Sequence, residues 1–177
     1  MPESNTILSA AAVQRAIARI AHEIAERNEA SGDVIIVGVQ RGGVQLAARL
    51  AGLLSGIWSH PVYAGTLDVS MHRDDLHQSL APQVHATNIP GDINGKTVIL
   101  VDDVLYSGRT VRAALDALNL FGRPTRVQLA VLIDRGHREL PIKADFVGKN
   151  VPTNRNERIN VRWQEVDGGD EVRLDRP

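Results

Sequence analysis

The sequence contains no cysteine, which excludes a disulfide framework and any zinc or iron–sulfur site held by thiolates. A bound metal would need oxygen or histidine ligands. The sequence also lacks an excess of either charge, because 20 Lys and Arg oppose 21 Asp and Glu for a net charge of -1. Any nucleic-acid site must therefore be a local basic patch.

Long hydrophobic runs are missing as well. None approaches the length needed to cross a bilayer, and the first five residues lack a basic region followed by an apolar stretch. We therefore expect a cytoplasmic protein with no membrane partner. What remains is an ordinary globular composition of 177 residues, 43% hydrophobic and 23% charged, which predicts one domain over 1–177.

Apolar periodicity predicts strands and helices in alternation. A β-branched run such as 34–39 is typical of a strand buried on both faces, and apolar residues at three- and four-residue spacing are typical of a helix packed by one face. The expected elements are a helix from Ser9 to about Asn28, a strand over 34–39, a helix opened by Gly42 and Gly43, strands over 61–70 and 97–101, a helix closed by Gly122, a strand over 127–133, and short strands near 146–147 and 159–166. This order predicts an α/β fold with a doubly wound, mostly parallel sheet that binds ligands at the carboxyl ends of its strands.

The segment over 98–110 carries the strongest chemical signal. An apolar strand passes through two carboxylates into a small-residue turn that opens a helix, and the turn consists of Ser107, Gly108, Arg109 and Thr110. Backbone amides, hydroxyls and a cation at a helix N-terminus favour a phosphate group, and the glycine lets the backbone approach it closely. Because the Gly-Lys-Ser/Thr ending of a Walker loop is missing, a phosphate monoester fits better than a nucleoside triphosphate.

Asp102 and Asp103 precede this turn, where the hydroxyls of a sugar carrying the phosphate would fall. If the reaction breaks the bond at the anomeric carbon, their negative charge stabilises an oxocarbenium-like ribose more than the neutral ground state. The plainer alternative is a strand that ends in two solvated carboxylates and a turn that only caps the next helix.

These motifs resemble the type I phosphoribosyltransferases, whose signature is an apolar strand, two acidic residues and a Thr/Ser-Gly-rich turn that holds the 5-phosphate. Further segments make the chain similar to the pyrimidine-operon regulator and uracil phosphoribosyltransferase family, PyrR: Arg19–Glu23, Arg73–Leu76, Asp134–Ile142 and Gly148–Asn150. The resemblance covers nearly the whole chain. It implies a type I fold with a small hood, contributed by about 134–177 and the N-terminal segment.

The resemblance also implies a role for particular residues. Asp102 and Asp103 would bind ribose, and Tyr106 would join the turn as part of the 5-phosphate loop. The pyrophosphate loop would comprise Gln40, Arg41 and Gly42, although the family usually has Thr where this chain has Gln40. The part of the hood that reads the base, through backbone hydrogen bonds to the uracil edge, would include Asp134, Arg135, Gly136, His137 and Arg138.

The polar segment from about 71 to 95 has no helical or strand period, which is typical of a long functional loop. The resemblance makes it the flexible loop that closes over the substrates, with Arg73 as a catalytic contact to pyrophosphate. His72, His77 and His85 are irregularly spaced, which favours solvated side chains over a metal site. We expect Mg²⁺ as the cofactor, held by pyrophosphate, ribose hydroxyl and water oxygens with no direct protein ligand.

The expected activity is therefore the formation of UMP and pyrophosphate from uracil and 5-phosphoribosyl-1-pyrophosphate (PRPP). The resemblance adds, as a second role, binding of pyrimidine-operon leader mRNA that depends on uridine nucleotides and regulates transcription. One alternative is mainly an RNA-binding attenuation regulator with vestigial catalysis, which binds pyrimidine-operon leader mRNA in response to uridine nucleotides. Its candidate contacts are Arg15, Arg19, His22 and Lys149, although a solvated helix face explains the first three equally well. A second alternative is a purine or xanthine phosphoribosyltransferase. The resemblance also implies a homodimer or higher homo-oligomer.

Overall fold

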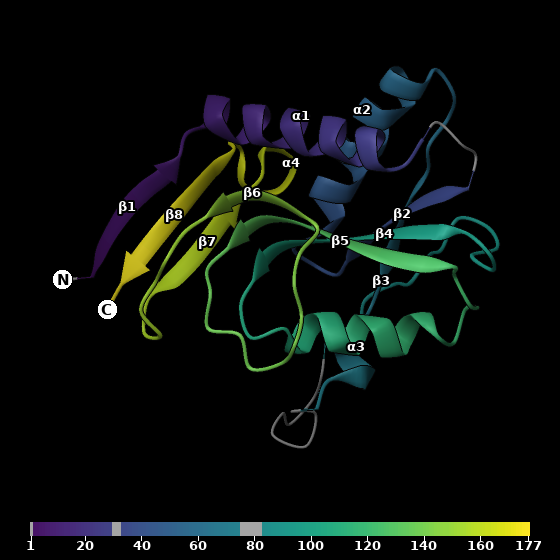
Figure 1. The fold of residues 1–177 in the computed structure, drawn as a ribbon. Coiled ribbons are helices and arrows are strands. Elements are labelled where there is room, and N and C mark those ends of the chain that lie inside the picture. Colours follow the sequence, from purple (N-terminus) through teal and green to yellow (C-terminus); the bar gives the residue numbers. More distant parts are fainter. Residues whose placement is uncertain (1, 30–32, 75–82) are drawn as a thin grey trace.

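A computed structural model describes residues 2–29, 33–74 and 83–177 (Figure 1). Its centre is a parallel five-stranded sheet in the order β3-β2-β4-β5-β6. These strands are β2 (Val34–Val39), β3 (Ala64–Leu67), β4 (Thr97–Leu105), β5 (Arg126–Asp134) and β6 (Phe146–Asn150). The predicted α/β fold with a parallel sheet is confirmed.

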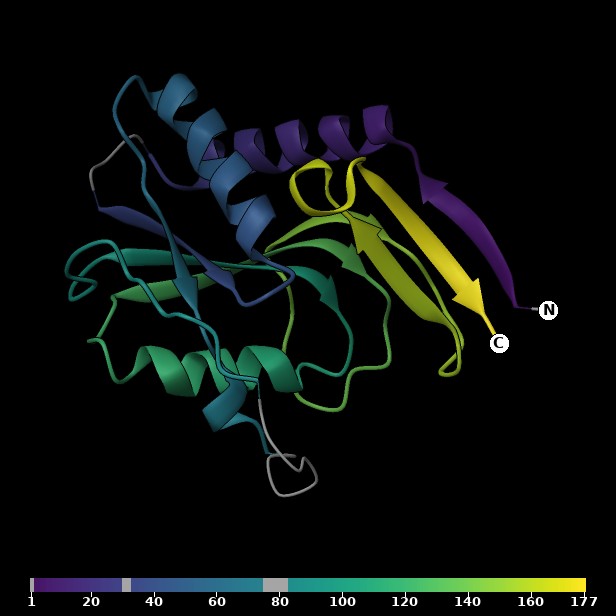
Figure 2. The same cartoon turned by 180° about the vertical axis from the view of Figure 1, so that it is seen from behind.

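Helices cover both faces of this sheet. The helices α1 (Ala10–Arg27) and α2 (Val44–Trp58) pack on one face, and α3 (Arg109–Leu118) packs on the other (Figures 1 and 2). Because successive strand residues point to opposite faces, Ile99 and Val101 of β4 join the core under α1 and α2, whereas Val98 and Leu100 join the core under α3. All six residues of β2 are buried, as its continuous apolar run predicts.

The first helix has the predicted bounds. The Ser9 side chain accepts a hydrogen bond from the Ala12 amide and caps the N-terminus, and Asn28 caps the C-terminus. The Asn28 side chain also donates to Gln128 of β5 at 2.7 Å, so a buried polar pair holds this end of α1 on the sheet.

A second, antiparallel sheet lies beyond the carboxyl ends of the parallel strands (Figure 1). Its strand order is β1-β8-β7, with β1 (Glu3–Leu8), β7 (Arg158–Arg162) and β8 (Glu171–Arg176), and the short helix α4 (Gln164–Asp167) connects β7 to β8. We call these four elements the hood.

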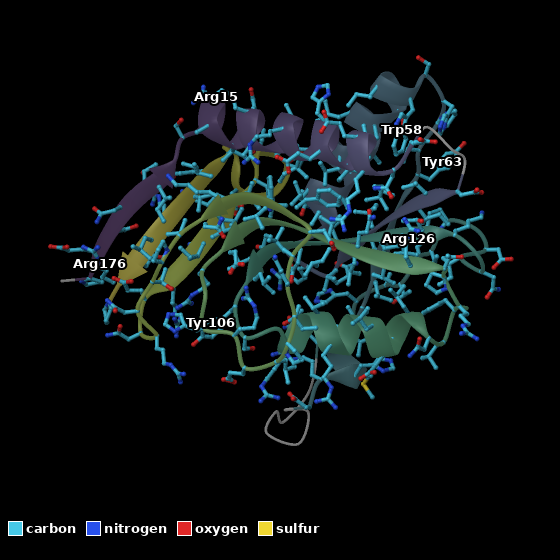
Figure 3. All side chains as sticks on the ribbon, in the orientation of Figure 1. Arg15, Trp58, Tyr63, Tyr106, Arg126 and Arg176 are labelled. Atoms are coloured by element: carbon cyan, nitrogen blue, oxygen red, sulfur yellow. The ribbon has the colours of Figure 1, made fainter. Side chains whose placement is uncertain are left out.

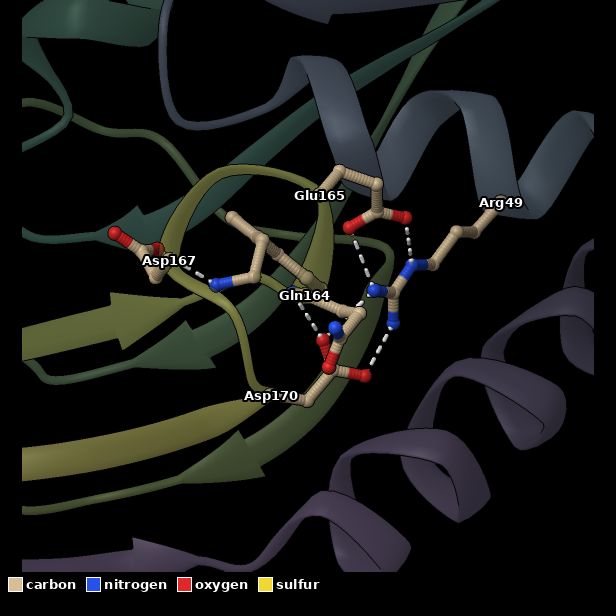
Figure 4. Close-up of polar contacts among 6 residues, drawn as sticks. Arg49, Gln164, Glu165, Asp167 and Asp170 are labelled. Atoms are coloured by element: carbon tan, nitrogen blue, oxygen red, sulfur yellow. Dashed lines mark hydrogen bonds and ion pairs between the residues drawn. The ribbon is translucent and has the colours of Figure 1, made fainter.

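A charged cluster fastens the hood to α2 (Figure 4). The Arg49 guanidinium donates to both oxygens of Asp170, at 2.6 and 2.7 Å, and to both oxygens of Glu165, at 2.8 and 3.0 Å. It also lies 4.9 Å from the ring centroid of the buried Trp163. We call Arg49, Glu165 and Asp170 the hood clamp.

Several predicted boundaries are wrong. The strand expected over 61–70 is only β3, and a 3-10 turn, η1 (Ser70–His72), follows it. The helix expected to close at Gly122 ends at Leu118 with Asn119 as its cap. The strand expected over 159–166 ends at Arg162, because α4 begins two residues later.

The predicted loop over 71–95 is partly packed. Asn88 forms a bridge with Thr66 of β3, and Ile93 is fully buried in the core under α3. Residues 75–82, with His77 among them, lie outside the described residues, so the flexible loop stays a prediction there.

Candidate active site

Asp102 and Asp103, which we call the acidic pair, lie within a strand rather than after it. Strand β4 continues four residues beyond Val101, to Leu105, so Asp102 and Asp103 belong to its carboxyl end. Successive strand residues point to opposite sides, and the two carboxylates border different cavities. Asp102 lines a cavity of about 550 Å³, and Asp103 lines one of about 400 Å³. The pair thus lies at the meeting point of two cavities.

The small-residue turn forms one wall of the larger cavity, as predicted for Tyr106, Ser107, Gly108, Arg109 and Thr110. Gly108 has a φ of 93°, in the left-handed region, and a Cβ added there would lie 3.0 Å from Ile142. Helix α3 begins at the next residue, and the first turn of any helix leaves amide donors without partners inside the helix. The turn therefore has the backbone geometry of an anion site.

The side chain of Arg109 is occupied by two carboxylates. Its Nε donates to Glu139 Oε1 at 3.2 Å, and its Nη1 forms an ion pair with Asp74. Glu139 and then Asp74 raise the pKa of Arg109. Neither partner is a predicted site residue, because both lie about 30 or more residues away along the chain. The cation expected at the turn is therefore already paired within the protein, and the Arg109 amide donates to Ser107 Oγ at 3.3 Å. The hydroxyls of Ser107 and Thr110 and the next amides of the first helical turn would be the donors to a ligand.

The smaller cavity brings the predicted pyrophosphate loop against Asp103. Gln40, Arg41 and Gly42 line it, and the peptide bond between the first two is cis. A Cβ added to Gly42 would lie 2.5 Å from the Asp103 carboxylate, and one added to Gly43 would lie 2.1 Å from the carbonyl oxygen of Val101. Two glycines are therefore needed for this loop to approach β4 so closely.

Asp102 is 8% exposed, and its pKa is raised well above the usual range. Burial is the main cause and the negative charge of Asp103 the second, while Arg73, which lines the same cavity, acts weakly in the opposite direction. Asp102 Oδ1 accepts the amide of Asp103 at 2.8 Å. A buried carboxylate beside a like charge is typical of a functional site.

The segment predicted to read the base leaves β5 beside the turn. Arg138 donates to the carbonyl of Tyr106 at 2.6 Å and to the carboxylate of Asp134 at 2.7 Å. Gly136 and His137 both have positive φ, 80° and 67°. The charged side chains therefore hold this segment against the turn, and the Gly136 amide is itself bonded to Asp134 Oδ1 at 3.0 Å.

Thr153 and Asn154, which were not predicted from the sequence, hold this segment from the other side. Arg135 donates to Thr153 Oγ1 at 3.0 Å and to the Asn154 carbonyl at 2.9 Å, while its guanidinium lies 4.2 Å from the ring centroid of Tyr106. His137 Nε2 donates to the Thr153 carbonyl at 2.5 Å. Their only signal in the sequence is their place shortly after the Gly148–Asn150 motif.

The predicted RNA contacts lie in another region. Arg15, Arg19 and His22 are exposed on α1, where Figure 3 shows Arg15 well separated from Tyr106 of the turn. Arg19 donates to the carbonyl of Gly148 on β6, the strand that also carries Lys149. The structure therefore brings the helix and this strand side by side.

Within 2–29, 33–74 and 83–177, no three His, Asp or Glu side chains gather into a group that could hold a metal ion. No helix in these ranges is both long and apolar enough to cross a membrane. The carboxylates of Asp102 and Asp103 are nevertheless oxygen donors of the kind that Mg²⁺ prefers.

Comparison with known proteins defines the class first. The model of the phosphoribosyl transferase domain family matches residues 3–165. The hypoxanthine phosphoribosyltransferase of Trypanosoma cruzi superposes with a TM-score of 0.73 over 98% of this chain and 97% of that chain, at 19% identity. A hypoxanthine-guanine phosphoribosyltransferase of Bacillus anthracis gives 0.72 over 98% of both chains, at 20% identity. At these identities the two structures show the fold alone, and the chain has a phosphoribosyl transferase domain.

More similar relatives narrow the family. The bifunctional protein PyrR of Roseiflexus sp. (strain RS-1) is 65% identical over 164 residues, covering 92% of this chain and 90% of the relative. That of Chloroflexus aurantiacus is 57% identical over 173 residues, covering 97% and 95%. That of Bacillus pumilus is 51% identical over 177 residues, covering 98% of each. The chain belongs to the PyrR family, as its motifs predicted.

Proposed function

We propose that this chain transfers the phosphoribosyl group of PRPP to uracil, forming UMP and releasing pyrophosphate. The observation that carries the proposal is the place of the acidic pair between two cavities. The N-terminal amides of α3 border one cavity, and the loop of Arg41 borders the other. A sugar with an anionic group at each end would lie across Asp102 and Asp103.

In this reaction the bond from the anomeric carbon to the pyrophosphate oxygen breaks and pyrophosphate keeps the electron pair. A bond forms from the anomeric carbon to N1 of uracil, and the N1 proton passes to pyrophosphate or to water. The ribose becomes oxocarbenium-like, and the fixed charge of Asp102 and Asp103 stabilises it. Arg41 would contact the departing pyrophosphate, whose negative charge grows as the bond breaks. Arg73 lines the larger cavity with Asp102 rather than the cavity of Arg41, so it would reach the pyrophosphate from the ribose side. Asp102 and Asp103 are the oxygen-bearing side chains that would face a Mg²⁺ ion bound with the substrate, and the ion would neutralise negative charge on the leaving pyrophosphate.

The base would lie against the backbone of Gly136 and His137. The side chains of Arg135, His137 and Arg138 are held by carbonyl or carboxylate partners, and the Gly136 amide is held by Asp134. The His137 amide and the backbone carbonyls of Gly136 and His137 are therefore the groups that would pair with the uracil edge. Polar pairing of this kind discriminates among bases far better than apolar fit.

The deciding experiment measures pyrophosphate release with uracil, hypoxanthine, guanine and xanthine side by side, in the presence of PRPP and Mg²⁺. We expect turnover with uracil and little with the three purines. Turnover of a purine but not of uracil would overturn the substrate assignment and favour a purine or xanthine phosphoribosyltransferase.

A second function, binding of pyrimidine-operon leader mRNA, has independent support. Arg15, Arg19 and His22 are exposed on a helix that lies beside the strand of Lys149, so basic side chains from two elements would lie on one local surface, where Arg19 also pairs with Glu23. The relatives are also named bifunctional.

Filter binding with a pyrimidine leader hairpin tests this function. We expect tighter binding than to a scrambled hairpin, enhancement by a uridine nucleotide, and weakening as salt rises. Equal affinity for both hairpins at two salt concentrations would remove the proposal, whatever the outcome of the uracil assay.

A further inference from the structure

The residues just after η1 are bound by ion pairs to α3, the helix that follows the small-residue turn. The Asp74 carboxylate forms an ion pair with Arg109 and lies 3.9 Å from Nη1 of Arg112, one turn further along α3. Asp74 itself lines the larger cavity together with Arg73 and Asp102. A carboxylate therefore lies at the rim of a cavity whose backbone amides favour anions.

The Arg109 guanidinium bridges two segments across this rim. One carboxylate that it binds, Asp74, follows η1, and the other, Glu139, belongs to the segment predicted to read the base. Arg109 itself is the first residue of α3. We call Asp74, Arg109 and Glu139 the rim bridge.

This bridge contributes little to stability. Its three side chains are 38 to 42% exposed, and exposed ion pairs are screened by water and salt. The bridge acts more directly on the position of Arg73, because Arg73 immediately precedes Asp74 in the sequence. Fixing Asp74 on α3 restricts where Arg73 can lie, and the charge of Arg73 is felt at Asp102.

We propose that Asp74 is a positioning residue, whose ion pair with Arg109 fixes the segment after η1 on α3 and so holds Arg73 at the ribose end of the larger cavity. The inference rests on the proposed function and deepens it. It also predicts that Asp74 has opposite effects on phosphate binding and on the chemical step. The negative charge of Asp74 weakens phosphate binding at the turn, while the placement of Arg73 favours the chemical step.

The first test is Asp74→Asn, which keeps the shape of the side chain and removes its charge. We expect kcat to fall about 10-fold, because misplacing a group at the reacting centre costs rate. The dissociation constant of ribose 5-phosphate should stay the same or fall, since a like charge has left the cavity. The matched control is Glu23→Gln, which removes a carboxylate of the same 38% exposure from the Arg19 pair, and it should leave kcat unchanged.

A loss of kcat without a loss of phosphate affinity distinguishes a positioning role of Asp74 from a general structural defect. A general defect would weaken phosphate binding and lower kcat together, and that result would overturn the proposal, as would an unchanged kcat. A double-mutant cycle adds a second criterion. Asp74→Asn should have no further effect on kcat in an Arg109→Gln background, because the ion pair is already absent. Additive losses would count against the pair.

Hydrogen–deuterium exchange tests the attachment without any activity. The amides of Ser70 and His72 are bonded to Asp68 Oδ1 at 3.1 Å and to the Val69 carbonyl at 2.9 Å. We expect both amides to exchange faster in Asp74→Asn than in the wild type, whereas equal exchange would overturn the inference. If the wild type turns over no base, the proposed function fails and this comparison still decides the inference.

Discussion

Two buried aspartates of this molecule have opposite electrostatic surroundings. Asp170, in the hood clamp, has a side chain 5% exposed and accepts two hydrogen bonds from Arg49 and one from the Gln164 amide at 2.7 Å. Its pKa is lowered, chiefly by Arg49. Asp102, at the end of β4, is 8% exposed and lies beside another carboxylate, and its pKa is raised by burial and by Asp103.

The difference separates a structural charge from a functional one. A buried carboxylate with a bidentate cationic partner is stable in its ionised form and fastens the hood to α2. A buried carboxylate beside a like charge is held in an unfavourable state that a developing positive charge would relieve. Of these two aspartates, the one without a cationic partner lies where the proposed substrate would compensate its charge.

The largest expected effect comes from breaking the hood clamp. Arg49→Ala leaves Asp170 buried without its cation, and we expect the free energy of unfolding to fall by about 3 kcal/mol. Urea denaturation checks this value. As a control, Arg27→Ala removes a partly exposed pair with Asp145 and a contact 5.8 Å from the Phe146 ring centroid, and it should change the free energy of unfolding by less than about 1 kcal/mol. Equal effects of the two changes would show that the clamp behaves as a surface pair.

Substitutions in the acidic pair should lower turnover rather than stability. Asp103→Asn keeps the hydrogen-bonding shape but cannot offset positive charge on the ribose, so kcat should fall on the order of 100-fold with uracil and PRPP. Steady-state kinetics measures the loss, and urea denaturation should give a transition close to that of the wild type. Unchanged turnover would remove Asp103 from the mechanism.

Asp102→Asn should lower turnover yet stabilise the fold, by about 1 kcal/mol at neutral pH. Because the folded state raises the pKa of Asp102, the wild type loses stability as pH rises from the ordinary value of 3.8 through the folded value. The gain of the variant should therefore be absent below pH 3.8 and grow as pH rises. A variant less stable than the wild type at pH 7 would mean that the ionised Asp102 is compensated within the protein.

The hood clamp should show the reverse dependence on pH. Its pairing lowers the pKa of Asp170 below 3.8, so the stability that it contributes is present above that value and is lost as pH falls through the folded pKa. The destabilisation caused by Arg49→Ala should therefore shrink in acid, as measured by thermal unfolding at pH 7 and below pH 3.8. A constant difference would assign the effect to packing on Trp163 rather than to charge.

The smallest expected effect is on the rim bridge. Glu139→Gln removes one of the two carboxylates on Arg109, and the midpoint of thermal unfolding should move by less than about 2 °C, because all three side chains are exposed. Differential scanning calorimetry checks the shift. A shift as large as that of Arg49→Ala would mean that the rim bridge stabilises the fold as much as the hood clamp does.

Elements with a strong local signal were predicted from the sequence. The buried run of β2, the Ser9-capped helix and the turn after Asp103 lie where their patterns indicate, because each depends on neighbours along the chain. The sequence predicted only part of the hood sheet. Strand β1 is exposed except near its end, and it pairs with β8 through the backbone and through contacts such as Ser4 with Asp175 at 2.6 Å.

The partners of the charged residues were decided only by the tertiary structure. Nothing near Arg109 in the sequence indicates Asp74 or Glu139, and nothing near Asp170 indicates Arg49, which lies 121 residues earlier. The local pattern of backbone donors and apolar side chains determined which segments form strands, helices and an anion-binding turn. Whether a buried carboxylate is neutralised or left beside a like charge depends on groups that only folding brings together, because electrostatic interactions act through space and not along the chain.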